Sequence, residues 1–149
     1  MGNGRLQGKT ALVTGSGQGI GEGIAKVFAS EGAEVVVATR TAASGKTTVD
    51  DITAAGGLAI LVPTDVQHQG DIDNAIDVTI KTYGKLDIMV HNAASFAGGM
   101  IEDYAPMDLE DSLSTNLKAA FSLAKASIPH MKELGGGRLL YTSSVTGPR

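Results

Sequence analysis

Short apolar runs alternate along the chain with segments in which apolar residues recur every three or four positions. Five runs are typical of strands buried on both faces: 11–13, 35–38, 58–62, 86–90 and 138–142. Four segments have helical periodicity: 20–30, 41–55, 71–83 and 108–128. This alternation predicts an α/β fold, a doubly wound parallel sheet of about five strands in the order 3-2-1-4-5 with helices on both faces. In such a sheet a ligand binds beyond the carboxyl ends of the strands, where the strand order reverses.

The longest predicted helix has Asp108 as its N-cap, and Pro129 is expected to kink or end it. Its apolar stripe consists of Leu109, Leu113, Leu117, Phe121, Ala124 and Ile128. Asn116 falls on or beside this stripe, which places an amide at the buried face of the helix. A buried amide costs about 1–3 kcal/mol unless it is hydrogen-bonded, so Asn116 is expected to hold a backbone group or a water near the fourth strand. A purely structural role for this amide is the alternative.

Composition limits the classes of function. The chain has 149 residues, which predicts one domain over 1–149, and its 42% hydrophobic and 19% charged content is typical of a globular protein. A net charge of −4 without a basic cluster argues against nucleic acid and anionic membranes as partners. Cysteine is absent, and neither a membrane-length apolar run nor a signal-peptide core occurs. These features favour a cytoplasmic protein.

A glycine-rich turn joins the first strand to the first helix and contains Gly15, Ser16, Gly17, Gln18, Gly19, Ile20 and Gly21. Unpaired N–H groups and the positive end of the helix dipole face such a turn, and glycines let a diphosphate approach the backbone. The spacing is T-G-x-x-x-G-x-G, whereas G-x-G-x-x-G fails because Ile20 takes the sixth place. A P-loop fails because Arg40 stands where it needs a glycine. We expect residues 15–21 to bind a dinucleotide, and a glycine turn without a ligand is the alternative.

The second and third strands are followed by residues that suit the adenosine half of such a ligand. After the second strand come Thr39 and Arg40, where a dinucleotide-binding fold commonly has an acid for the ribose 2′-hydroxyl. Arginine suits a 2′-phosphate instead, through charge-assisted hydrogen bonds, so the sequence favours NADP. After the third strand, the Asp65 carboxylate is placed to accept from the adenine amine while Val66 packs on the ring. A solvated arginine and an ordinary loop aspartate are the alternatives.

The fourth and fifth strands also end in candidate site residues. Asn92, Ala93 and Ala94 follow the fourth strand, where the small alanines let a cofactor lie against the backbone and Asn92 is expected to bond neighbouring strands. His91 is interpreted as a polar side chain satisfied locally rather than as a catalytic base, and no histidine has the spacing of a metal ligand. Ser144 follows the fifth strand, where its hydroxyl is placed to bond a substrate carbonyl, although serines at a strand end are also common turn formers.

Taken in chain order, these motifs resemble the short-chain dehydrogenase/reductase family. The resemblance covers essentially the whole chain and rests on 14–21, 65–66, 91–94, Asn116 and 143–147. It implies a Rossmann fold and hydride transfer between a nicotinamide cofactor (NADP, with NAD as the alternative) and a small-molecule alcohol or carbonyl substrate. By motif, Ser144 is similar to the family's catalytic serine, Asn116 to its catalytic asparagine, and Arg40 to the basic residue of NADP-preferring members. The full-length form is expected to be a homo-oligomer.

The sequence departs from the family pattern in three ways. His91 and Ala94 replace the usual Asn and Gly of Asn-Asn-Ala-Gly, and Gln18 stands where many NADP-binding members have a second basic residue. No tyrosine has a lysine four residues later, so the family's Tyr-x-x-x-Lys motif is absent from these 149 residues. We therefore expect the N-terminal part of a longer enzyme, C-terminally truncated, with the fifth strand as an open edge. The alternatives are a non-catalytic dinucleotide-binding fragment and an interaction module that dimerises through the long helix or that edge.

Overall fold

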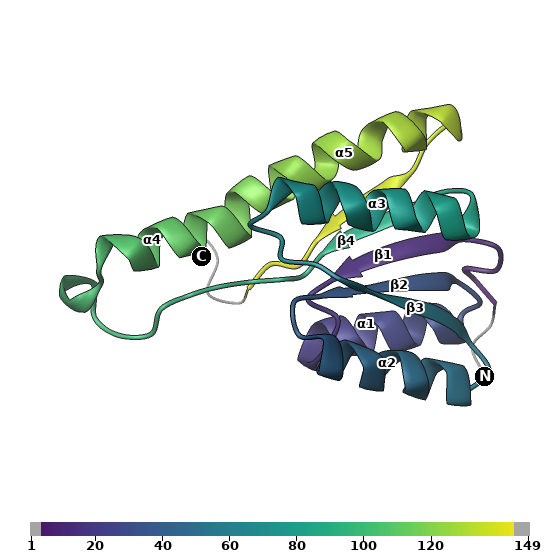
Figure 1. Cartoon of the computed structure of the whole chain (residues 1–149), viewed down its shortest axis with the longest axis horizontal. Helices are drawn as coiled ribbons and strands as arrows, with labels where there is room; N and C mark the ends of the chain where they lie inside the picture. The colour runs from purple at the N-terminus through teal and green to yellow at the C-terminus, as the bar shows by residue number, and fades with distance from the viewer. Residues whose placement is uncertain (1–3, 145–149) are drawn as a thin grey trace.

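The centre of the protein is a parallel sheet whose strand order is β3-β2-β1-β4-β5, with the reversal between β1 and β4. The computed structural model describes residues 4–144. Within them the strands are β1 (Thr10–Thr14), β2 (Glu34–Thr39), β3 (Leu58–Pro63), β4 (Ile88–His91) and β5 (Arg138–Tyr141). The predicted fold class and strand order are confirmed (Figure 1).

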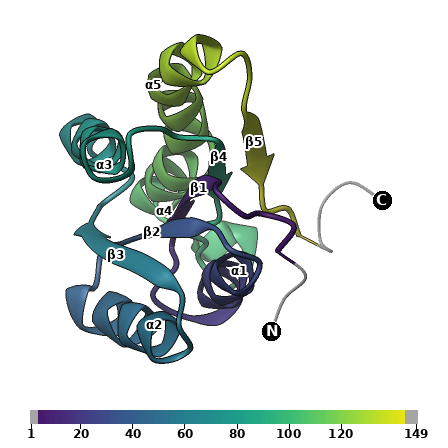
Figure 2. The ribbon, with the colours of Figure 1, turned by 90° about the vertical axis from the view of Figure 1, so that its right-hand side faces the viewer.

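Helices cover both faces of the sheet, as Figure 2 shows. One face carries α1 (Gly19–Ser30) and α2 (Ala42–Ala54), and the other carries α3 (Gln69–Tyr83) and α5 (Ala119–Glu133). Alternate residues of a strand point to opposite faces, so Val13 and Val35 pack on the side of α1 and α2, whereas Leu12 and Val36 pack on the side of α3 and α5. Burial on both faces explains why β1, β2 and β4 are continuous apolar runs in the sequence. The prediction of burial on both faces is wrong for β3 and β5, which lie at the two edges of the sheet and are only partly buried.

The connection from β4 to α5 reaches past the carboxyl ends of the strands (Figure 1). It contains the 3₁₀ turn η1 (Ile101–Asp103), helix α4 (Pro106–Leu113) and the π-helical turn η2 (Ser114–Lys118), which continues directly into α5. The prediction of Asp108 as N-cap is wrong, because the helix begins at Pro106, whose fixed φ and missing N–H suit a first helical position. Asp108 lies within the first turn, where its Oδ2 accepts the Ala105 N–H at 2.8 Å.

The predicted apolar stripe of this long helix does not face the core. Leu117 and Phe121 are 65% and 70% exposed, and Leu109 and Ile128 are exposed as well. The buried side consists of Thr115, Ala119, Leu123, Ser127 and Met131. These residues recur every four positions and include small side chains, which let the helix approach the sheet and α3 closely. The larger apolar side chains are left on the outer surface.

Pro129 was predicted to kink or end the helix, and the second alternative is wrong, because α5 passes through Pro129 and ends at Glu133. Met131, which is 4% exposed, packs the following turn into the core, and this packing offsets the backbone hydrogen bond that proline cannot make. Several other boundaries differ by one or two residues from the predicted ones, and the two-residue differences are at the starts of β4 and α3. Strand β4 begins at Ile88 rather than at position 86, and α3 begins at Gln69 rather than at position 71.

Strand β5 forms one edge of the described sheet, as predicted for the fifth strand. Its residues Leu140 and Tyr141 are 42% and 47% exposed, unlike the buried residues of β1 and β4.

Over residues 4–144, no helix has both the length and the apolar character needed to cross a bilayer.

Candidate functional site

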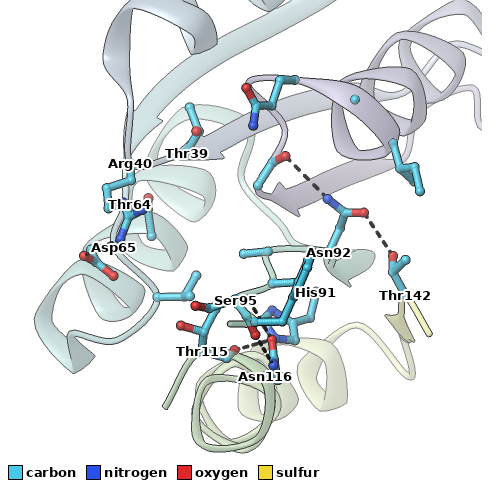
Figure 3. A pocket seen from close by; sticks show the side chains of 18 of the residues that line it. Thr39, Arg40, Thr64, Asp65, His91, Asn92, Ser95, Thr115, Asn116 and Thr142 are labelled. Carbon is cyan, nitrogen blue, oxygen red and sulfur yellow. Dashed lines mark hydrogen bonds and ion pairs between the residues drawn. The ribbon is translucent and has the colours of Figure 1, made fainter. Parts of the chain in front are cut away.

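The carboxyl ends of all five strands surround one cavity of about 1130 Å³ (Figure 3). The predicted site residues that line it are Gly15, Gln18, Gly19, Ile20, Thr39, Arg40, Asp65, Val66, Asn92, Ala93, Ala94, Asn116 and Ser144. The sequence therefore predicted which segments meet, because parallel strands bring their carboxyl ends to one edge. The other three predicted residues, Ser16, Gly17 and Gly21, belong to the glycine turn but do not line the cavity.

The glycine turn is pressed against the segment that follows β4. Gly15 has a φ of +65°, and a Cβ at this position would lie 2.8 Å from the Ala93 Cα. A Cβ on Gly21 would overlap the Gly15 carbonyl oxygen and lie 2.5 Å from Asn92 Nδ2. The absence of a side chain at Gly15 and Gly21 thus lets this turn, the cradle, pack closely against its own backbone and the segment after β4. Ser16 points inward and donates from its Oγ to the Val13 carbonyl at 2.7 Å, and its backbone N–H and carbonyl are hydrogen-bonded to Ala38 and Thr48.

The cradle meets the N-terminus of α1, which begins at Gly19. Helix α1 has no side-chain cap: Gln18 occupies the N-cap position in extended backbone and makes no capping hydrogen bond through its side chain. The first N–H groups of a helix have no partner within the helix and carry the positive end of its dipole. The turn therefore presents donors and positive potential to the cavity, a combination that suits a diphosphate.

Arg40 and Asp65 lie at the end of the cavity formed by β2 and β3. Arg40 Nη1 is 3.9 Å from Asp65 Oδ2, and the arginine side chain is 76% exposed. At this exposure the ion pair contributes little to stability and leaves the guanidinium donors accessible to an anion. Thr41 and Ser44 also line this end, although no sequence motif marked them. The only sequence feature that could have indicated Thr41 and Ser44 is their position at the start of the helix that follows the second strand.

Asn92 connects the two sides of the strand-order reversal. Its Nδ2 donates to the Gly15 carbonyl at 3.4 Å, and its Oδ1 accepts from Thr142 Oγ1 at 3.2 Å (Figure 3). The prediction that Asn92 bonds neighbouring strands is confirmed. One amide therefore ties the glycine turn after β1 to the segment after β5, with β4 between them.

Asn116 lies in the π-helical turn η2 and holds the backbone of Ser95. Its Oδ1 accepts the Ser95 N–H at 3.0 Å, and its Nδ2 donates to the Ser95 carbonyl at 2.6 Å and to Ser112 Oγ at 3.1 Å. The prediction that Asn116 holds a backbone group after the fourth strand is confirmed. The prediction of burial is wrong: the residue is exposed and lines the cavity, because the core-facing side of η2 is taken by Thr115.

His91 is buried at the end of β4 and hydrogen-bonded at both ring nitrogens, to Thr14 and to the Thr115 carbonyl. Burial lowers the pKa of His91, and the hydrogen bonds from its ring to the backbone of Thr115 and Asn116 oppose this shift. The interpretation of His91 as a locally satisfied side chain is confirmed. Thr115 was not predicted as a site residue, since a threonine within a helical pattern carries no signal of its own.

Ser143 and Ser144 complete the lining at the β5 side of the cavity. The remaining residues of the predicted serine motif, Val145, Thr146 and Gly147, lie outside the described residues. Within residues 4–144, no three His, Asp or Glu side chains are grouped so that they could hold a metal ion.

Known proteins are similar to this chain in sequence and in fold. A family model described as short chain dehydrogenase matches residues 9–149. The chain is 38% identical over 142 residues to an uncharacterized oxidoreductase of Thermotoga maritima, covering 95% of this chain and 56% of that protein. It is also similar to the solved structure of a 7α-hydroxysteroid dehydrogenase complexed with NADH and 7-oxo glycochenodeoxycholic acid, with a TM-score of 0.91, 35% identity, and coverage of 95% of this chain and 55% of that one.

A metagenomic short-chain oxidoreductase in complex with NADP is similar as well, with a TM-score of 0.90, 32% identity, and coverage of 97% of this chain and 66% of that one. These two structures hold NADH and NADP respectively. The chain spans about half the length of the curated relatives that it matches, with shares of 56%, 50% and 54%.

Proposed function

Because the chain belongs to the short-chain dehydrogenase family, we propose that it binds NADP(H) and forms the cofactor-binding part of an oxidoreductase. The reaction is hydride transfer between NADP(H) and an alcohol or carbonyl substrate. The observation that carries this proposal is the meeting, in one cavity, of a glycine turn at the uncapped N-terminus of α1 with an accessible arginine and no acid after β2.

The residues that line the cavity fit an extended dinucleotide. In this proposal the glycine turn and the N-terminus of α1 bind the diphosphate, Arg40 and Thr39 bind the 2′-phosphate, and Asp65 and Val66 bind adenine. The backbone of 92–94 forms the wall beside the nicotinamide. When bound, the nicotinamide supplies or accepts the hydride.

Two residues are proposed to act on the substrate side of the same cavity. Ser144 donates its hydroxyl hydrogen to the substrate oxygen, which stabilises negative charge as it develops there. Asn116 keeps the Ser95 segment in place beside the wall through its two hydrogen bonds to the Ser95 backbone.

An assay of NADPH oxidation against a panel of aldehydes and ketones tests turnover. NADPH binding without any turnover would favour the alternative, a dinucleotide-binding chain that is not catalytic on its own.

The preference for NADP is tested by Arg40→Asp. This change removes a cation and adds an anion beside the proposed 2′-phosphate, and a hydrogen bond to a charged group is worth about 1.5–3 kcal/mol. We expect the ratio of NADPH to NADH affinity to fall by about 10- to 100-fold, as measured by fluorescence titration of both cofactors.

Lys46→Asp is the matched control for Arg40→Asp. The substitution makes the same change of charge as Arg40→Asp. Lys46 lies on α2, pairs with Asp50 on the surface and does not line the cavity. We expect the affinity ratio of this variant to stay near that of the wild type. Equal ratios in Arg40→Asp and the wild type would contradict NADP recognition by Arg40.

We also propose that the protein self-associates through the outer side of the long helix. Leu109, Leu117 and Phe121 form an exposed apolar row there, and such rows are typical of interfaces. Phe121→Asp is expected to lower the mass measured by light scattering to that of the 15.2 kDa monomer. Val27→Asp, an exposed apolar position on α1, is the control and should leave the mass unchanged. A wild-type chain that is monomeric throughout a concentration series would contradict this proposal.

A further inference from the structure

Both ring nitrogens of His91 are engaged inside the protein. The imidazole is 5% exposed, with Nδ1 3.2 Å from Thr14 Oγ1 on β1 and Nε2 3.0 Å from the Thr115 carbonyl oxygen in η2. Figure 3 shows His91 between Asn92 and the turn that carries Thr115 and Asn116. The ring therefore joins the strand that leads into the glycine turn to the helical turn that carries Asn116.

The hydrogen-bond partners determine which nitrogen carries the proton. Thr14 Oγ1 accepts the N–H groups of Asn92 and Ala93, at 3.0 and 3.2 Å. A threonine hydroxyl has two lone pairs and one hydrogen, so the remaining hydrogen is donated to His91 Nδ1. The Thr115 carbonyl can only accept, so Nε2 carries the ring hydrogen. His91 is thus a neutral imidazole in the Nε2–H form.

Thr115 is held from two directions. His91 donates to its carbonyl, and Gln67 Nε2 from the segment after β3 donates to its Oγ1 at 2.9 Å. The next residue, Asn116, makes the two hydrogen bonds to the Ser95 backbone. Because Thr115 and Asn116 belong to one helical turn, the position of the Thr115 carbonyl sets the position of the Asn116 side chain and of Ser95.

We propose that His91 is a positioning residue: it locks turn η2, and with it Asn116, onto Thr14 and so onto the backbone of Asn92 and Ala93. We call this chain of hydrogen bonds, from Thr14 through His91 to Thr115, the relay. It fixes the position of the substrate side of the cavity relative to the wall that the cofactor contacts. Its importance for catalysis rests on the proposed function, whereas the relay itself is a property of the chain.

Protonation of His91 breaks this relay. An imidazolium donates from both nitrogens, and an Nδ1–H would face a Thr14 hydroxyl whose lone pairs already accept two backbone N–H groups. Burial lowers the pKa of His91, so the relay persists at neutral pH and opens on acidification. The titratable side chain against the ring is Tyr141, edge-on with centroids 6.4 Å apart, and within residues 4–144 no carboxylate forms an ion pair with His91.

The first test is ¹⁵N NMR of the histidine rings in the labelled 149-residue chain at neutral pH without cofactor. We expect the Nε2–H pattern for His91, with Nδ1 unprotonated. His130 on α5, which does not line the cavity, should give the averaged pattern of exchanging tautomers. A protonated His91, or one in the Nδ1–H form, would overturn the proposal. This measurement needs no variant, so it does not depend on how well a mutant folds.

The second test follows the Asn116 side-chain amide and the Ser95 N–H while pH is lowered. Both resonances should shift with the midpoint of His91, which should lie below the ordinary histidine value because burial lowers the pKa of this ring. His91→Phe should change them at neutral pH and speed hydrogen exchange of the Ser95 N–H about ten-fold, whereas His130→Phe should not. If the Asn116 and Ser95 resonances did not change as His91 titrates, the proposal would be overturned. Failure of the wild type to bind NADPH would instead contradict the proposed function and leave these signals intact.

Discussion

Gly21→Ala is expected to abolish measurable NADPH binding, whereas Gly23→Ala, two residues further along the same helix, leaves binding unchanged. The Cβ added at Gly21 would overlap the Gly15 carbonyl oxygen and approach Asn92 Nδ2 to 2.5 Å, while a Cβ at Gly23 has no atom within 4 Å. The clash is with backbone, so the turn must open to relieve it. Opening separates the donors that the diphosphate needs, and overpacking of this kind also costs about 1–3 kcal/mol of folding free energy.

Comparing the two variants distinguishes an effect on the glycine turn from a general effect of replacing a glycine in α1. Both replace a glycine in α1 by alanine, and alanine is favoured in a helix by about 0.5–1 kcal/mol, so Gly23→Ala should be slightly more stable than the wild type. Urea unfolding gives the stability of each variant, and fluorescence titration gives its NADPH affinity. If Gly21→Ala bound NADPH as the wild type does, the glycine turn would not be the diphosphate site.

The second large effect is expected for Thr14→Val, which should lower the free energy of unfolding by about 3 kcal/mol or more. Thr14 is fully buried, and its hydroxyl serves Asn92 N–H, Ala93 N–H and His91 Nδ1 together. Valine has nearly the same shape but leaves these three polar groups without a partner. Each unsatisfied buried group costs about 1–3 kcal/mol.

Thr14→Ser is the matched control, because it keeps the hydroxyl and removes one methyl group. Its loss of stability should be well below that of Thr14→Val, near the cost of about one buried methyl group, roughly 1 kcal/mol. Urea unfolding at pH 7.5, where His91 is neutral, measures both. Equal losses for the two variants would show that packing rather than the hydroxyl accounts for the effect.

The elements of the fold that follow from hydrophobic periodicity, and from glycines at the ends of elements, were predictable from the sequence. Strands buried on both faces leave apolar runs, and the glycines that separate runs from periodic segments mark the connections, so the order of elements and of the sheet was correct. The meeting of Arg40, Asp65, Asn92 and Ser144 at one cavity followed from parallel topology alone.

The long helix was not predictable in the same way. Two of its faces are apolar, one with large residues such as Leu117 and Phe121 and one with Ala119 and Leu123. Periodicity favoured the face with larger side chains, but the sheet and α3 take the face that packs more closely. The π-helical turn η2 has no sequence signature, and it is what directs Asn116 to the cavity rather than to the core.

The hydrogen-bond relay through His91 was also beyond the sequence. A histidine at a strand end could be predicted to be satisfied locally, but its partners come from β1 and from a turn 24 residues later. Only the folded arrangement assigns its tautomer and connects it to Asn116.

We propose that the cavity at the carboxyl ends of the strands is an NADP site. The most direct measurement is calorimetric titration of the wild-type chain with NADPH and, separately, with NADH. We predict saturable binding of one NADPH per chain, at least about ten-fold tighter than NADH, because only NADPH has a 2′-phosphate for Arg40. No binding of either cofactor, or equal or tighter binding of NADH, would contradict this claim.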